Sequence, residues 1–143
     1  MTAVHVPPTF NSVSGVGVVV RSVNPLRGRT VLIIEDEPLI ALELHNTLHI
    51  AGASILAATT VKDALELIRR AQICAAIVDV NLGGDDCSGI CAALAKRSIP
   101  FMFYTGYSTA VALAAWPQAP AVNKPADSST MVEIIAQLMP SAR

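Results

Sequence analysis

Four short apolar runs in this sequence each end in residues whose side chains handle phosphate groups or metal ions. The runs are residues 31–34, 75–78, 101–104 and 120–123. The residues that follow or close them are, in chain order, Glu35 with Asp36, Asp79, Thr105 and Lys124. If the runs form neighbouring parallel strands, their ends share one edge of a sheet, where α/β folds bind ligands. We therefore expect carboxylates, a hydroxyl and an ammonium group in one pocket.

Asp36 and Asp79 would repel each other in such a pocket unless a cation or a proton lies between them. Two carboxylates about 4 Å apart repel by roughly 4 kcal/mol at an effective dielectric constant of about 20. Mg²⁺ suits the site because it takes a few carboxylates, keeps waters and leaves room for a phosphate oxygen. Asp79 could then attack phosphorus and form an aspartyl phosphate. Lys124 would neutralise the phosphoryl oxygens, and the Thr105 hydroxyl would donate a hydrogen bond to one of them.

Apolar runs alternate with helical periods from residue 29 onward, which predicts βα units in series. Pro38 suits a first helical turn, and Ile40, Leu44 and Leu48 recur every four residues until Gly52 ends the helix. Further strands are expected at residues 53–58, 74–78, 100–104 and 119–122. Five such units imply an α/β fold with a flavodoxin-like, doubly wound parallel sheet. The expected strand order is 2-1-3-4-5, with helices on both faces.

Three more helices are predicted from apolar stripes, and one segment is ambiguous. The stripes are Ala64, Leu65 and Ile68; Ile90, Ala93 and Leu94; and Met131, Ile134, Ile135 and Leu138. Thr59 or Thr60 can cap the first of these helices, and Asp86 or Ser88 the second. Residues 83–86 are expected to form a loop, and residues 108–115 show little period.

Length, charge and cysteine content limit the function classes. The chain has 143 residues, which suits one domain, and 52% hydrophobic residues, which suits a sheet covered on both faces. No apolar stretch reaches the about 18 residues of a membrane span, so we expect no membrane partner. The net charge of −1 gives no reason to expect nucleic acid. Three cysteines without metal-site spacing indicate reduced thiols and a cytoplasmic protein.

Residues 1–28 are predicted to be a flexible N-terminal extension, and residues 29–143 the folded domain. The first segment is rich in Gly, Pro, Ser and Asn and has no sustained period. It fits a secretory signal poorly. A start codon chosen upstream in error, or a docking role for its arginines, remain open interpretations.

The set of strand-end residues resembles the receiver domain of two-component response regulators. The resemblance covers residues 29–139 and rests on Glu35-Asp36, Asp79, Thr105 and Lys124-Pro125 in order. It implies that Asp79 accepts a phosphoryl group from a histidine kinase or a histidine phosphotransfer protein. It also implies Mg²⁺ held by Asp36, Asp79 and the backbone carbonyl of Asn81, with Glu35 assisting through water. The protein would then be a phosphoacceptor that assists its own phosphorylation and dephosphorylation, rather than an enzyme acting on a separate substrate.

A narrower resemblance is to the FAT GUY group of receivers, which are often paired with HWE-type kinases. It rests on residues 100–107, where Tyr104 replaces the usual alanine of the Phe-Ala-Thr-Gly-x-Tyr-like signature, and on residues 79–84. Gly83 replaces the proline common after the acceptor, and Ala121 replaces the aromatic residue expected three positions before Lys124. Signalling by rotation of that aromatic side chain is therefore not expected, and Tyr107 is a candidate substitute.

The chain ends after the last predicted helix, which suggests a stand-alone receiver whose output is altered binding to an unknown protein. The expected output surface is the fourth helix, fifth strand and fifth helix. Homodimerisation, a phosphate sink and a phosphorylation-independent binding module are the open alternatives. A haloacid-dehalogenase-like phosphatase would need a second aspartate where Pro38 stands, and an FMN carrier would need a phosphate loop where the acidic residues 35–37 stand.

Two other pairs have spacings that suit chemistry but have simpler interpretations. His45 and His49 lie four residues apart, without a third metal ligand, and are expected at the surface. Cys87 and Cys91 share that spacing and are expected to pack rather than react. Residues 79–84 imitate the start of an EF-hand loop, but the twelfth position is Ile90 rather than glutamate.

Overall fold

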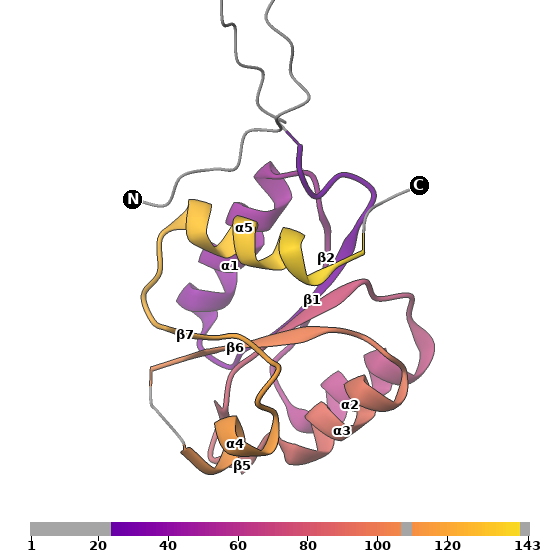
Figure 1. Ribbon diagram of the computed structural model, residues 1–143, viewed down its shortest axis with the longest axis vertical. Coiled ribbons are helices and arrows are strands. Elements are labelled where there is room, and N and C mark those ends of the chain that lie inside the picture. The colour runs from indigo at the N-terminus through magenta and orange to yellow at the C-terminus, as the bar shows by residue number, and fades with distance from the viewer. Residues whose placement is uncertain (1–23, 107–109, 141–143) are drawn as a thin grey trace, which may run out of the picture.

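The sheet has the predicted topology. The computed structural model describes residues 24–106 and 110–140. Its main sheet contains β1 (Thr30–Ile34), β2 (Ser54–Ala58), β3 (Ala75–Val78), β6 (Phe101–Thr105) and β7 (Ala121–Asn123). These five strands are all parallel and lie in the order β2-β1-β3-β6-β7 (Figure 1). Numbered along the chain within this sheet, the order is 2-1-3-4-5, so the flavodoxin-like α/β prediction is confirmed.

A small hairpin interrupts the series of βα units after β3. Strands β4 (Asn81–Leu82) and β5 (Asp85–Asp86) pair antiparallel in a separate two-stranded sheet. Gly83 and Gly84 connect them with φ angles of 61° and 89°, which glycine adopts without a steric penalty. The sequence prediction of a plain loop at residues 83–86 is therefore corrected. The hairpin forms because two consecutive glycines permit a tight turn.

Helices cover both faces of the sheet (Figure 1). On one face lie α1 (Pro38–Ile50) and α5 (Ser128–Leu138), and on the other α2 (Val61–Arg70), α3 (Ser88–Lys96) and α4 (Ala110–Ala115). Each face has its own apolar core, and every residue of β3 and β6 is buried. Because the strands are buried on both sides, they are continuous apolar runs rather than alternating ones.

The packed domain includes residues ahead of its predicted boundary. Leu26, assigned above to the extension, is fully buried in the core beneath α1 and α5. Its main-chain N–H donates to the carbonyl of Ala51 at 2.9 Å. The boundary at residue 29 is therefore corrected for residues 24–28, while residues 1–23 lie outside the described part of the chain.

Most helix predictions hold, with local corrections. Thr60 caps α2 by accepting from the Asp63 N–H at 3.1 Å. Leu65, predicted to be buried, is exposed because α2 packs through the row of Ala64 and Ile68. The residue at the N-cap of α3 is Cys87, whose side chain makes no cap hydrogen bond; the Asp86 carboxylate accepts from the Ser88 N–H at 2.8 Å.

The ambiguous segment contains α4, and the part of it at residues 108–109 lies outside the described residues. Among the described helices, none has the length and apolar character needed to cross a membrane.

Candidate phosphoacceptor site

The carboxyl ends of β1, β3, β6 and β7 meet at one edge of the sheet and bring all the predicted site residues together. They surround a pocket with a volume of about 390 Å³. Its lining consists of Asp36, Glu37, Asp79, Asn81, Gly83, Gly84, Gly106 and Lys124. Glu35 and Thr105 do not line it and are buried, each 2% exposed. Contiguity of the four strands, rather than closeness in sequence, creates this pocket.

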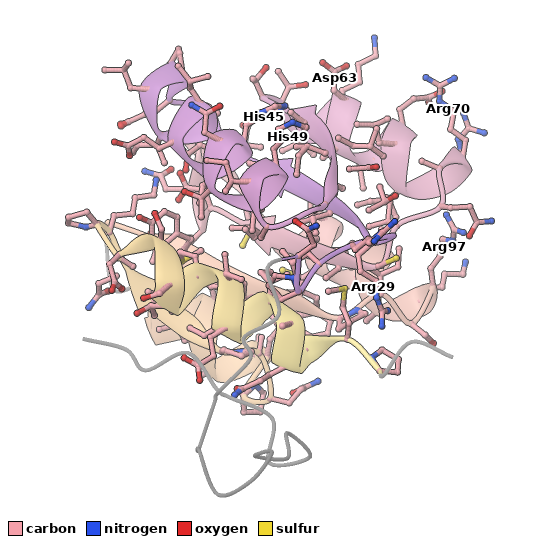
Figure 2. All side chains as sticks on the ribbon, turned by 90° about the horizontal axis from the view of Figure 1, so that it is seen from above. Arg29, His45, His49, Asp63, Arg70 and Arg97 are labelled. Atoms are coloured by element: carbon pink, nitrogen blue, oxygen red, sulfur yellow. The ribbon has the colours of Figure 1, made fainter. Side chains whose placement is uncertain are left out.

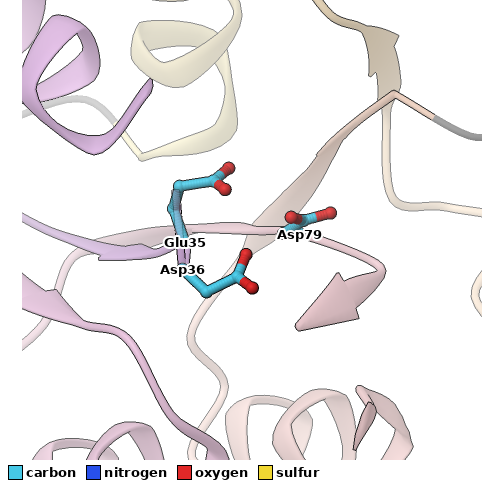
Figure 3. A group of neighbouring side chains, drawn as sticks. All are labelled: Glu35, Asp36 and Asp79. Atoms are coloured by element: carbon cyan, nitrogen blue, oxygen red, sulfur yellow. The ribbon is translucent and has the colours of Figure 1, made fainter. Parts of the chain in front are cut away.

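Glu35, Asp36 and Asp79, which we call the acidic half, point from β1 and β3 toward one space (Figure 3). Two of these carboxylates are fixed by the main chain just after them. The N–H of Glu37 donates to Glu35 Oε2 at 3.1 Å, and the N–H of Asn81 donates to Asp79 Oδ1 at 3.2 Å. In both cases the donor lies two residues downstream, so a short stretch of sequence is sufficient to orient the carboxylate.

Lys124 and Thr105, which we call the cationic half, lie directly after β7 and at the end of β6. Lys124 Nζ lies 2.7 Å from Glu35 Oε1 and 3.2 Å from Asp79 Oδ2. The Lys124 main-chain N–H donates to the Thr105 carbonyl at 3.0 Å. The ammonium group therefore bridges the carboxylates of β1 and β3.

Burial and neighbouring charges shift the ionisation of this bridge. Burial raises the pKa of the Glu35 carboxyl above its usual value, and the charge of Asp79 adds to this effect. Hydrogen bonds from Lys124 and the Glu37 N–H oppose the rise only partly. Burial lowers the pKa of Lys124, but Glu35 and Asp79 outweigh it and raise that pKa overall. The lysine is thus held firmly in its charged form.

The acidic half fits a divalent cation. One oxygen from each of Glu35, Asp36 and Asp79 lies within 4.8 Å of the other two. Three carboxylates face one ammonium group, which leaves an excess of negative charge that a divalent cation would balance. The side chain of Asn81 is already engaged, since its Oδ1 accepts from the Gly84 N–H at 3.1 Å. This bond ties the Asn81 side chain to the hairpin turn and leaves the backbone carbonyl of Asn81 free to be the ligand that the family resemblance implies.

Sequence reasoning missed one residue that supports the site. Tyr104, one position before Thr105, is buried, and its hydroxyl accepts the N–H of Ala126 at 3.0 Å. The sequence places Tyr104 next to Thr105, but nothing in it links this side chain to a residue 22 positions away. The one signal in the sequence is that Tyr104 stands where the signature of the FAT GUY receivers has alanine.

The other candidate residues stay apart from this pocket. His45 and His49 lie side by side on the exposed surface of α1, with ring centroids 5.8 Å apart (Figure 2). Cys87 and Cys91 are buried, as predicted. Ala121 is exposed on β7. Tyr107, the candidate substitute for the missing aromatic, lies outside the described residues.

Comparison with known proteins agrees with this geometry. Residues 31–136 match the family model of the response regulator receiver domain. This match spans most of the sequence, so the chain belongs to the receiver domain family, and the family predicted from the sequence is confirmed. Membership places the protein in two-component signal transduction. No curated protein matches the chain.

Solved structures of similar proteins show the same fold. SdrG from Sphingomonas melonis is 36% identical, with a TM-score of 0.67 over 78% of this chain and 97% of SdrG. A response regulator receiver protein from Sinorhizobium medicae is 22% identical, with a TM-score of 0.70 over 77% of this chain and 93% of that protein. A response regulator from Burkholderia pseudomallei is 22% identical, with a TM-score of 0.64 over 75% of this chain and 66% of that one.

Proposed function

We propose that this protein is a response regulator receiver that accepts a phosphoryl group on Asp79 with Mg²⁺ bound in the acidic half. The observation that carries the proposal is the ammonium of Lys124, 3.2 Å from Asp79 Oδ2, beside three clustered carboxylates. This arrangement places a nucleophile, a cation for the transferred group and metal ligands within one pocket. The donor would be a histidine kinase, of the HWE type by the narrower resemblance, or a histidine phosphotransfer protein.

The proposed transfer is an attack of a carboxylate oxygen of Asp79 on phosphorus. An Asp79 O–P bond forms while the P–N bond of the donor phosphohistidine breaks, and the leaving imidazole nitrogen keeps the electron pair. Lys124 is close enough to Asp79 to contact the new phosphoryl oxygens, and Thr105 would donate its hydroxyl hydrogen to another.

Asp36, Asp79 and the carbonyl of Asn81 would hold the magnesium ion, with Glu35 contributing through water. Bound there, the ion would neutralise charge that develops on the phosphoryl oxygens. One similar structure supports this chemistry, because the Burkholderia pseudomallei response regulator is described with a phosphorylated aspartic acid and a calcium ion.

The proposed output is a changed affinity for a protein partner at the surface formed by α4, β7 and α5. Phosphate on Asp79 would draw Thr105 toward it and bias the neighbouring segment. NMR spectra with Mg²⁺ and beryllofluoride test this output: resonance changes should reach α4, β7 and α5, and changes confined to the pocket would contradict it. The proposed compartment is the cytoplasm, because the three cysteines are free thiols.

Phosphorylation itself is tested by incubating the protein with acetyl phosphate and Mg²⁺ and measuring the intact mass. We expect one added phosphoryl group, and none with Asp79→Asn. Asp85→Asn is the matched control, because Asp85 is an exposed carboxylate of the nearby hairpin and lies outside the carboxylate cluster. Failure of the wild-type protein to gain a phosphoryl group from any donor would contradict the proposal and favour a module that acts by binding alone.

A further inference from the structure

Tyr104 connects the interior of the sheet to the turn that carries Lys124. Its side chain is 5% exposed and packs in the core beneath α1 and α5. Its hydroxyl accepts the main-chain N–H of Ala126 at 3.0 Å. Residues 124–126, which we call the lysine turn, thus donate a hydrogen bond to β6 at their far end.

The near end of the lysine turn is also tied to β6. There the Lys124 main-chain N–H donates to the carbonyl of Thr105 at 3.0 Å. The Lys124 ammonium lies 5.8 Å from the centroid of the Tyr104 ring, within the about 6 Å range of a cation–π contact. Tyr104 therefore contacts both the turn and the charged group that the turn carries.

The lysine turn depends on such contacts because β7 is a weak support. This strand has three residues, Ala121–Asn123, and within the described residues it pairs only with β6. Ala121 and Asn123 are exposed. Because β7 pairs on one side only, the main chain at Lys124 is positioned largely by the hydrogen bonds between the lysine turn and β6.

We infer that Tyr104 is a positioning residue for phosphoryl transfer, which acts by holding the lysine turn so that the Lys124 ammonium reaches the phosphoacceptor carboxylate. This inference rests on the function proposed above. It assigns to Tyr104 a role that the sequence alone did not suggest. Tyr104 stays outside the lining of the pocket and touches no reacting atom there. Its effect therefore has to pass through Lys124.

The test is the substitution Tyr104→Phe, which removes the hydroxyl and keeps the ring in the core. Phosphoryl uptake from acetyl phosphate at saturating Mg²⁺ should slow about fivefold, the factor expected for one lost hydrogen bond. Mg²⁺ binding should not weaken, because main-chain N–H groups orient Glu35 and Asp79 and a displaced ammonium group repels the ion less. Amide hydrogen exchange at Ala126 should become faster, while exchange in β1 and β3 stays as in the wild type.

Thr47→Ala is the matched control. The Thr47 hydroxyl lies 3.3 Å from that of Ser128 and lines the same cavity as Tyr104, but it makes no contact with the lysine turn that the structure shows. This variant should take up phosphate at the wild-type rate. A slowing equal to that of Tyr104→Phe would overturn the inference, because loosening between α1 and α5 would then explain both.

Three other outcomes separate this inference from the proposed function on which it rests. If wild-type protein takes up phosphate and Tyr104→Phe matches its rate, the positioning role is overturned and the proposed function stands. If Tyr104→Phe weakens Mg²⁺ binding and speeds exchange throughout the sheet, Tyr104 has a general structural role and the inference is overturned. If wild-type protein takes up no phosphate, both the proposed function and the inference fail.

Discussion

The acidic and cationic halves of the pocket are held in place by different means. In the acidic half, Glu35 and Asp79 each accept an N–H from the residue two positions downstream. In the cationic half, contacts with β6 position the main chain around Lys124. They are the hydrogen bonds that the Lys124 N–H donates to the Thr105 carbonyl and the Ala126 N–H to the Tyr104 hydroxyl. The first half is therefore organised by local chain geometry, and the second by contacts between strands far apart in sequence.

This difference predicts how each half of the pocket responds to substitutions in the other. β1 and β3 lie inside the sheet with a neighbour on each side, whereas β7 is an edge strand. The acidic half should keep its geometry when the cationic half is altered. The charges of the two halves are nevertheless coupled, because Lys124 balances the buried carboxylate of Glu35 across the pocket.

The largest effect is expected from Lys124→Met, which removes the charge of the cationic half. Phosphoryl uptake should fall about 100-fold, the typical result of losing one group that stabilises transition-state charge. Without Mg²⁺, the free energy of unfolding should fall by about 3 kcal/mol, because a buried carboxylate loses its partner. Uptake is measured by intact mass over time, and unfolding by urea titration.

The control for this variant is Lys62→Met, which removes an exposed lysine of α2. It should change neither uptake nor stability appreciably. Added Mg²⁺ should reduce the stability deficit of Lys124→Met, since a divalent cation supplies charge to the same carboxylates. Wild-type uptake by Lys124→Met would show that the two halves do not cooperate.

A smaller effect, with opposite signs in two measurements, is expected from Asp36→Asn in the acidic half. Mg²⁺ affinity should fall more than about tenfold, since even outer partners of metal sites are worth about 10–100-fold. Without Mg²⁺ the variant should be more stable than wild type by about 1 kcal/mol, because one of three like charges is gone. Calorimetric titration and urea unfolding give the two values.

Glu37→Gln is the matched control for Asp36→Asn. Glu37 is the next residue and lines the pocket, but its carboxylate is outside the cluster of three. Its loss should leave Mg²⁺ affinity close to that of wild type. Equal losses of affinity in the two variants would indicate a diffuse field of negative charge rather than a defined ligand set.

The smallest effect is expected from Asn81→Ala, which separates side-chain from main-chain roles in the acidic half. The Asn81 side chain accepts from the Gly84 N–H, so its loss should lower the free energy of unfolding by about 1 kcal/mol. Mg²⁺ affinity should change by no more than about twofold if the backbone carbonyl is the ligand. A loss as large as that of Asp36→Asn would identify the side chain as the ligand instead.

The fold was predictable where periodicity was strong. Continuous apolar runs predicted β1, β3 and β6, because strands covered on both faces bury nearly every residue. The stripe through Leu44 and Leu48 likewise predicted α1. The hairpin β4–β5 was missed because two-residue strands are too short to show a period. Leu65 was misplaced because the edge of a helix stripe is decided by the neighbouring elements.

The candidate site was predictable in its residue types but incomplete in its supports. Glu35, Asp36, Asp79, Thr105 and Lys124 were all placed at strand ends by their positions after apolar runs. Tyr104 looked like one more apolar strand residue, because a hydrogen bond to the N–H of Ala126 has no sequence pattern. Leu26 was placed in the extension for a similar reason, since its burial depends on the α1 and α5 side of the core.

The sequence by itself determined which residues stand at the strand ends. It also determined the main-chain bonds to Glu35 and Asp79, because each bond spans only three residues. The tertiary structure decided which carboxylates the ammonium of Lys124 reaches and how its turn is held. The physical reason is that the lysine turn lies beyond an edge strand with little support of its own. Its position follows from contacts with β6, which form only when the sheet is assembled.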